Sequence, residues 1–281
     1  MSKGNNIPVY RQLVQTVRTG FLALDVSIQN EISAFLKSQQ DNNGSFIDRA
    51  GTPDLYYSLF GLWLSLATEQ NKLRQNLDSY ISGRNNMETK SPVEDLAILI
   101  IQSELDPDHK KQSIFSLLKT VFSKGRMIEL SYQFFLLSLV IDSVGKNKRL
   151  YYFFARIWLY FYKPKGHIPC SLSAALVYAR KMLGLKTSNL QNKLLDFVAD
   201  HGGFRAFETV ETSDTLSTGV ALFVLKETGY DLRVIAPDCL NFVQDNYNSG
   251  AFLSGDGDNT KDLEYTFYGL LALGSLIENE E

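Results

Sequence analysis

One acidic residue, Asp214, stands at the start of an apolar run in the segment "ETVETSDTLSTGVALFVL" (208–225). An aspartate in this position can accept hydrogen bonds from the free backbone N–H groups of a helix and favours the positive end of its dipole. A carboxyl group that keeps its proton beside an apolar interior could instead donate that proton in a reaction. Helix capping and a chemical role are therefore both open for Asp214, and Thr212 or Ser213 could serve equally well as the cap.

A second group of oxygen-bearing side chains lies in the segment "DGDNTKDLE" at 256–264. Its members are Asp256, Asp258, Asp262, Glu264 and Thr260. Their alternation resembles the front half of a calcium loop, but Lys261 and Phe267 stand where an EF-hand needs glycine and glutamate. We expect a solvated acidic loop. A loose Mg²⁺ or Ca²⁺ site that serves a diphosphate is the alternative.

Thiols and imidazoles are scarce in this chain. Only two cysteines occur, Cys170 and Cys239, which excludes a disulfide framework. The start "MSKGNNIPVYRQ" lacks the apolar core of a signal peptide. Both observations fit a cytoplasmic protein.

The composition bounds the fold and the partners. With 281 residues and 44% hydrophobic content, the chain can bury a large core, and it reads as a single domain over 1–281. The formal net charge is -3, and the lysines and arginines are scattered rather than gathered on one face. We therefore expect no nucleic-acid partner.

The longest apolar run is "LYYFFARIWLYFY" at 150–162, with Arg156 in its middle. It is shorter than the roughly 20 residues that span a bilayer. We expect a helix that is buried on most sides. A patch that rests on a membrane surface, as a peripheral contact, is the alternative.

An internal repeat organises the chain, because three segments share a glycine, an aromatic residue, a polar loop and then an apolar helix. They are "GSFIDRAGTPDLYYSLFGLWLSL" from Gly44, "GGFRAFETVETSDTLSTGVALFVL" from Gly202 and "GAFLSGDGDNTKDLEYTFYGLLAL" from Gly250. The aromatic residue precedes a glycine of the helix by 15 (Phe46 to Gly61), 15 (Phe204 to Gly219) and 17 residues (Phe252 to Gly269). Counted back from that glycine, Asp214 shares its column with Tyr56 and Glu264.

Each repeat follows an amphipathic stretch, at 28–43, 189–201 and 236–248, so the unit is a helical hairpin. A shorter fourth copy turns at Gly166, and the segments 91–105 and 131–144 predict further apolar helices. The charged segment "TEQNKLRQN" (68–76) is typical of a solvated loop or helix end. Because no segment shows the alternation of apolar and polar residues that is typical of a strand, the sequence predicts an all-α fold. Five or six hairpins can close into a ring, with the more apolar helices inside.

The segment "FLKSQQDNNGSF" places Gln40, Gly44 and Phe46 in a pattern that resembles the repeat signature of the terpenoid cyclase and protein prenyltransferase superfamily. The segment "DLEYTFYGLLALGSL" (262–276) is similar to the last inner helix of protein prenyltransferase β subunits. The resemblance covers the first repeat and residues from about 190 onward. It implies an α/α toroid, a barrel of inner and outer helices whose central cavity binds an isoprenoid or another hydrophobic small molecule.

In protein prenyltransferases, as the resemblance implies, an Asp, a Cys and a distant His bind zinc, which activates a thiolate. The matching positions here are Asp214, Leu216 and Tyr265, so two of the three ligands are missing. We expect no zinc and no other cofactor, although His167, Cys170, His201 or Cys239 could substitute. Arg205 is the one candidate for a diphosphate near the Gly202 turn.

In class II terpene cyclases, as the resemblance also implies, an aspartic acid protonates an alkene in a cavity lined by aromatic rings. The segment "SDTLSTG" resembles that motif, with Asp214 in the place of the catalytic acid, but Thr212 stands where an upstream carboxylate is usual. The candidate substrate-binding residues are Tyr57, Phe60, Trp63, Phe223, Tyr265 and Tyr268. Their ordinary alternative is core packing.

Three functions therefore stay open. The first is an isoprenoid-binding toroid that acts as a class II-like cyclase through Asp214. The second is a catalytically degenerate toroid that binds a lipid, a peptide or a protein partner without chemistry. The third is a prenyltransferase-like protein without the usual zinc ligands, which acts through a metal-poor mechanism or as a β-like subunit that needs a helical partner chain.

Overall fold

The computed structural model describes residues 8–83, 89, 91–106, 138–143, 145, 148–162 and 167–277. Most of this part is helical, and its named strands are four segments of two residues each, so the all-α prediction is confirmed. The helices are α1 (Val9–Leu22), α2 (Val26–Ser38), α3 (Leu55–Ala67), α4 (Asn71–Ser82), α5 (Pro92–Leu105), α8 (Lys148–Phe161), α9 (Cys170–Met182), α10 (Ser188–Leu195), α11 (Thr215–Glu227), the 3₁₀ helix η2 (Leu232–Val234), α12 (Ala236–Asp245) and α13 (Leu263–Leu276). The strands β1 (Phe204–Arg205) and β2 (Ser213–Asp214) form one antiparallel pair, and β3 (Tyr247–Asn248) and β4 (Ala251–Phe252) form the other.

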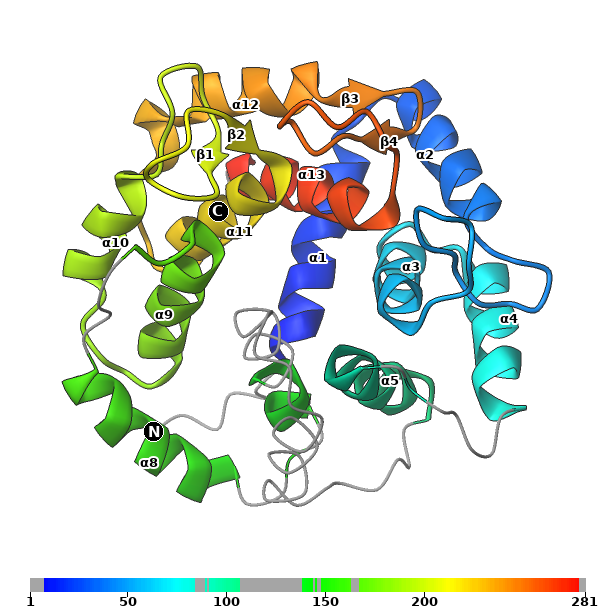
Figure 1. The fold of residues 1–281 in the computed structure, drawn as a ribbon, viewed down its shortest axis with the longest axis horizontal. Coiled ribbons are helices and arrows are strands. Elements are labelled where there is room, and N and C mark those ends of the chain that lie inside the picture. Colours follow the sequence, from blue (N-terminus) through cyan, green and yellow to red (C-terminus); the bar gives the residue numbers. More distant parts are fainter. Residues whose placement is uncertain are drawn as a thin grey trace.

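The helices divide into a peripheral and a more central set (Figure 1). In the view of Figure 1, α2, α4, α8, α10 and α12 lie around the outside, and α3, α5, α9, α11 and α13 lie inside them. Peripheral helices bury one narrow stripe: Ile32 and Leu36 are the buried residues of α2, and Cys239 and Val243 are those of α12. The central helices α3, α11 and α13 are buried over most of their residues, α13 most of all. This difference follows from the apolar content of the helix after each turn.

Three glycine turns pack closely against the backbone of helices in neighbouring hairpins. Gly44, Gly202 and Gly250 have φ values of +96°, +85° and +93°, which side chains other than glycine rarely adopt. A Cβ on Gly44 would lie 2.3 Å from the carbonyl oxygen of Asn76 in α4. A Cβ on Gly250 would lie 2.5 Å from the carbonyl oxygen of Glu31 in α2. The turn of the last hairpin thus packs against the peripheral helix of the first.

Helix α1 contacts the C-terminal halves of α3, α5, α9 and α13. Its side chains reach the end of α5, where the Tyr10 hydroxyl donates to Glu104, and the position after α3, where Arg18 pairs with Glu69 at 2.7 Å. The Tyr178 hydroxyl of α9 donates to Gln12 of α1 at 3.0 Å. The buried stripe of α1 consists of Tyr10, Leu13, Val17, Gly20 and Phe21. This amphipathic helix therefore covers the C-terminal ends of α3, α5 and α9.

The expectation that residues 150–162 form a helix buried on most sides is wrong. The helix exists, as α8, but only Leu159 among its described side chains is fully buried. The exposed fractions are 58% for Phe153, 60% for Phe154, 58% for Trp158 and 74% for Phe161. High apolar content alone does not establish burial, and α8 presents most of its aromatic rings outward.

Two other predicted features lie wholly or partly outside the described residues. The fourth turn, at Gly166, lies outside them. Of the predicted helix at 131–144, residues 131–137 and 144 lie outside them as well. The predicted helix at 91–105 is confirmed as α5. In the part of the chain that the structure describes, no helix is long and apolar enough to cross a membrane.

Candidate functional site

Three aspartates cap the central helices α3, α11 and α13 at one end. Asp54, Asp214 and Asp262 are the N-cap residues. One carboxylate oxygen of each accepts the backbone N–H three residues later, at 2.9, 2.7 and 2.8 Å respectively. Each bond satisfies a free N–H group of the first turn. We call this end of the three helices the cap face.

A hydroxyl residue four positions after each aspartate ties the cap to the glycine turn. Ser58, Thr218 and Thr266 donate to the carbonyl oxygens of Asp54, Asp214 and Asp262, each at 2.7 Å. The same hydroxyls accept the backbone N–H groups of Phe46, Phe204 and Phe252, at 3.0, 2.8 and 3.3 Å. All three phenylalanines are buried. The repeated unit is therefore an aromatic residue, an N-cap aspartate and a hydroxyl in the first turn of the helix.

This pattern corrects the alignment of the repeats that the glycine spacing predicts. The structural counterparts of Asp214 are Asp54 and Asp262, not Tyr56 and Glu264. Gly61 and Gly269 face the rings of Phe46 and Phe252, whereas Gly219 faces the backbone of Tyr268. Since Gly219 has a different contact, the glycine is an unsuitable marker for the middle repeat.

Asp214 differs from the other two caps in its second oxygen. Oδ1 caps α11, whereas Oδ2 is buried and has no hydrogen-bond partner among the described residues. Burial raises the pKa of Asp214, the hydrogen bonds from Ser217 oppose this, and the charge of Asp256 adds to the rise. The negative charge of Asp214 in turn helps to raise the pKa of Cys170, although burial is the main cause there. Asp214 is thus a helix cap whose pKa lies above the usual value for an aspartate.

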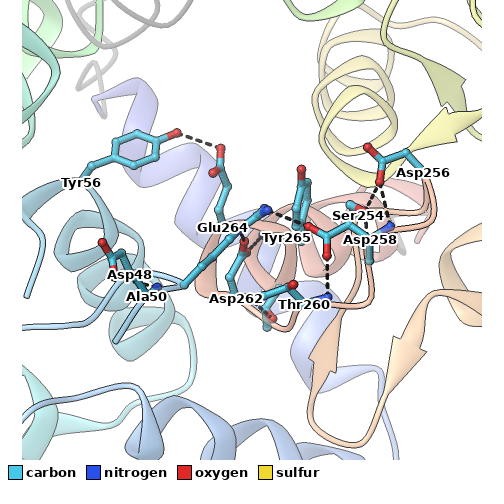
Figure 2. Close-up of polar contacts among 12 residues, drawn as sticks. Asp48, Ala50, Tyr56, Ser254, Asp256, Asp258, Thr260, Asp262, Glu264 and Tyr265 are labelled. Atoms are coloured by element: carbon cyan, nitrogen blue, oxygen red, sulfur yellow. Dashed lines mark hydrogen bonds and ion pairs between the residues drawn. The ribbon is translucent and has the colours of Figure 1, made fainter. Parts of the chain in front are cut away.

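Arg49 links the first hairpin to the last at the cap face, through Asp258 and Asp262, which Figure 2 labels. Its Nε lies 2.5 Å from Asp262 Oδ2, and its Nη1 lies 2.8 Å from Asp258 Oδ2. The guanidinium also lies 4.9 Å from the centre of the Tyr265 ring. Burial raises the pKa of Asp262, while the Tyr265 N–H and Arg49 oppose the rise. The acidic loop therefore supplies carboxylates to an arginine of the same chain.

Glu264 is a buried carboxylate among tyrosines, in the first turn of α13. The Tyr56 hydroxyl donates to its Oε1 at 2.8 Å (Figure 2). Burial raises the pKa values of Tyr57, Tyr265 and Tyr268, and the charge of Glu264 contributes to each rise. The charge of Asp214 also contributes to the raised pKa of Tyr268. Two carboxylates, those of Glu264 and Asp214, therefore act on this hydroxyl.

The six candidate substrate-binding residues fall into three groups. Phe60, Trp63 and Tyr268 are almost fully buried, and Phe60 packs edge-to-face on both partners at 5.6 and 5.8 Å between ring centres. Tyr57 and Tyr265 are partly buried beside Arg49. Phe223 packs on Tyr178 of α9, at 5.7 Å. The structure therefore groups five of the six at α3 and α13 and places Phe223 on the α9 side of α11.

The indole N–H of Trp63 is a further unusual group in this cluster. It is buried and has no hydrogen-bond partner among the described residues. The Trp63 ring lies 5.3 Å from the Phe267 ring and 5.6 Å from the Phe60 ring, so its surroundings are aromatic. A buried donor without an acceptor is costly, which makes Trp63, in the C-terminal half of α3, a second group with unused hydrogen-bonding capacity.

Metal-binding residues do not gather in the described part of the chain. No group of three or more histidine, cysteine, aspartate or glutamate side chains there could hold a metal ion. Cys170 and Cys239 are buried, and His167 and His201 are exposed. Arg205, the diphosphate candidate, donates to the carbonyl oxygens of Asp196, Phe197 and Glu208 instead.

No family model matches the chain, and no curated protein or solved structure matches it significantly. The site residues that sequence reasoning missed are Asp54, Tyr56 and Arg49. Asp54 and Ser58 could have been found from the sequence, because an aspartate followed four residues later by serine or threonine precedes each of α3, α11 and α13. Arg49 carries none, since its partner Asp262 lies 213 residues away.

Proposed function

We propose that the chain is a single α/α toroid of the terpenoid cyclase and protein prenyltransferase type that binds an isoprenoid-like molecule at the cap face. Two structural relationships support the toroid. Central and peripheral helices alternate along the chain, and the Gly250 turn of the last hairpin packs against α2 of the first. Arg49 adds a second connection between these hairpins, through Asp258 and Asp262.

We propose further that Asp214 is a proton donor in a class II-like cyclisation. The observation that carries this proposal is the buried Oδ2 of Asp214, which no described group engages while Oδ1 caps α11. A carboxyl group with a raised pKa and a free oxygen can hold the proton that such a reaction needs.

The step is an addition of this proton to a carbon–carbon double bond. The electron pair of the π bond forms the new C–H bond, a carbocation remains on the other carbon, and Asp214 becomes a carboxylate. Ring closure moves the cation, and loss of a different proton to water ends the reaction. Aromatic faces, such as those of Phe60 and Tyr268, would stabilise the cation. Water then reprotonates Asp214.

The test has two stages. Native mass spectrometry of the protein, after incubation with farnesyl and geranylgeranyl diphosphates, squalene and a lipid extract, identifies a retained isoprenoid. The retained compound is then incubated with the protein in D₂O, and the product is analysed by mass spectrometry. We expect a cyclic isomer with one deuterium on carbon, because Asp214 exchanges its proton with solvent before each turnover.

Asp214→Asn is the informative variant, with Asp54→Asn as its matched control. Asparagine keeps an oxygen for the cap in both variants, but at position 214 it cannot donate a carboxylic proton. We expect turnover to fall at least about 100-fold in Asp214→Asn, as for loss of a general acid, and to change little in Asp54→Asn. Equal turnover in Asp214→Asn and the unchanged protein would refute the proton-donor role.

A toroid that binds without chemistry is the second candidate. It is favoured by the dense packing of Phe60 against Trp63 and Tyr268, and by α1, which covers the C-terminal ends of several central helices. A retained isoprenoid without any product in D₂O would support this candidate. Stoichiometric zinc in the purified protein would instead favour the prenyltransferase-like alternative.

A further inference from the structure

Helix α8 carries the largest exposed apolar side chains of any described helix. Six of its large apolar residues are more than two fifths exposed: Phe153 (58%), Phe154 (60%), Ile157 (45%), Trp158 (58%), Tyr160 (66%) and Phe161 (74%). Clusters of exposed apolar residues of this size mark interaction sites in proteins. This feature is separate from the cap face and plays no part in the proposed reaction.

The exposed residues form one continuous side of the helix. Residues seven apart in an α-helix lie on the same face, so Phe154 stacks above Phe161, with Ile157 between them. Tyr160 and Trp158 flank this apolar centre on opposite sides. We call the exposed side, with these five residues and Phe153, the aromatic face. Rings with a polar atom thus border an apolar middle, which is the arrangement that suits a boundary between oil and water.

The opposite side of α8 fixes the helix to the protein. Leu159 is 5% exposed, and its carbonyl oxygen accepts a hydrogen bond from Arg180 of α9 at 2.8 Å. The Tyr152 hydroxyl donates to Asp142 Oδ1 at 2.7 Å. Because Asp142 also accepts the backbone N–H of Val9, α8 is tied to α1 as well as to α9. The aromatic face is therefore held outward on a fixed helix.

The charged residues of α8, and of the segments directly beside it in the sequence, are all basic. Between Gly145 and His167 the sequence contains six lysines and arginines and no aspartate or glutamate, although the whole chain has a net charge of -3. Arg149 and Arg156 of α8 are exposed, and their seven-residue spacing places them along one edge of the aromatic face. A basic edge beside exposed aromatic rings is complementary to an apolar layer with an anionic surface.

We propose that α8 docks this protein on the surface of an anionic lipid bilayer, with the helix in the plane of the interface. Phe154, Ile157 and Phe161 would enter the acyl boundary, while Arg149 and Arg156 would meet lipid phosphates. A second copy of the chain fits this face less well, because a two-fold pairing would bring the arginines of both copies to the same interface. The proposal does not depend on the reaction proposed for Asp214.

Vesicle sedimentation tests the docking. The protein is mixed with vesicles of phosphatidylcholine alone or with phosphatidylserine added, and the bound fraction is measured against lipid concentration. We expect binding to the anionic vesicles that weakens in high salt. Arg149→Gln with Arg156→Gln should weaken it roughly 30-fold, because each basic residue near the surface contributes a factor of about five. Phe154→Ser with Phe161→Ser should weaken it by about 100-fold.

A matched control removes exposed apolar residues elsewhere. Val26→Ser with Val234→Ser changes side chains that are 71% and 82% exposed, far from α8 in the sequence, and should leave vesicle binding unchanged. Equal losses in the control and the phenylalanine variant would overturn the proposal. So would a protein that fails to bind anionic vesicles, or one that forms a dimer in solution which the phenylalanine variant abolishes.

Tryptophan fluorescence gives an independent readout, because the chain has two tryptophans. Trp63→Phe leaves Trp158 of the aromatic face as the only one. We expect its emission to shift to shorter wavelength on addition of anionic vesicles and to be quenched by brominated lipid. Unchanged Trp158 emission in the presence of vesicles that bind the protein would show that another surface makes the contact.

Discussion

Gly20 of α1 and Gly274 of α13 meet backbone to backbone. A Cβ on Gly20 would lie 2.2 Å from the Leu270 carbonyl oxygen and 2.8 Å from the Gly274 nitrogen. A Cβ on Gly274 would lie 1.9 Å from the Thr16 carbonyl oxygen. The two helices thus approach as closely as their main chains allow, which requires glycine on both sides.

The first prediction concerns this contact. Gly274→Ala should lower the free energy of unfolding by about 3 kcal/mol, because α1 must move away from α13 to admit the methyl group. Urea unfolding followed by circular dichroism measures the loss. Gly83→Ala is the control, since its Cβ meets no atom closer than 3.2 Å and its φ of -73° suits alanine. If both variants lose the same stability, the close approach of α1 and α13 is not the cause.

The second prediction concerns the hydroxyl of the repeat. Thr218→Val should lower the free energy of unfolding by about 2 kcal/mol, because the buried N–H of Phe204 would lose its acceptor. Thr218→Ser keeps the hydroxyl and should lose much less. Amide hydrogen exchange at Phe204, measured by NMR, should accelerate in the valine variant alone. Equal stability of the valine and serine variants would show that this hydrogen bond is dispensable.

Much of the fold is predictable from local sequence signals. The glycine turns and the apolar helices α3, α11 and α13 follow from composition and spacing, since burial selects those residue types. Helix α1 lies outside the predicted repeat, although Tyr10, Leu13 and Val17 have helical spacing. The prediction of a solvated loop or helix end over 68–76 is incomplete. Helix α4 begins in this segment, and among its polar residues it has a narrow buried stripe of Leu73, Leu77 and Ile81.

The cap face is only partly predictable. A cap at Asp214 follows from an acidic residue before an apolar helix, and this hypothesis is confirmed. Its chemical role stays a prediction. The burial of Oδ2 and the hydrogen bond from Arg49 to Asp262 depend on how distant hairpins pack. The type of a single residue in the sequence does not reveal that packing. The same limit explains the error at α8, where apolar content alone does not reveal which face the protein covers.

The third prediction concerns the link between the first and last hairpins. Arg49→Met should lower the free energy of unfolding by about 2 kcal/mol at neutral pH, because Asp262, whose side chain is 2% exposed, would keep a buried charge without its partner. Arg233→Met removes an exposed pair with Asp231 and should cost almost nothing. Chemical unfolding of both variants checks the contrast.

The pH dependence of Arg49→Met distinguishes a charge effect from a packing effect. Burial already raises the pKa of Asp262, and loss of Arg49 removes a group that opposes the rise. As the pH falls through that raised pKa, Asp262 takes up a proton and no longer needs a cation. The deficit of the variant should therefore shrink in acid. A deficit that stays constant from pH 7 to pH 4 would indicate lost packing of the arginine stem.

The fourth prediction concerns how the effect of Asp214→Asn on stability depends on pH. Because its pKa is raised in the folded state, Asp214 contributes stability that is complete below the pKa of the unfolded chain. That contribution is lost as the pH rises through the folded-state pKa. The asparagine of the variant Asp214→Asn stays neutral throughout. The stability of this variant relative to the unchanged protein should therefore increase with pH, by about 1.4 kcal/mol for each unit of pKa difference.

Thermal unfolding of Asp214→Asn at pH 4 and pH 7, beside Asp54→Asn, measures this change. Asp54 caps α3 with the same geometry but has no buried oxygen without a partner among the described residues, so its variant should not show the same gain at pH 7. A residue that destabilises the fold when charged, and whose loss also removes turnover, has the properties of a functional acid rather than of a cap alone. If Asp214→Asn is the less stable protein at both pH values by the same amount, Oδ2 is solvated and Asp214 serves only as the cap of α11.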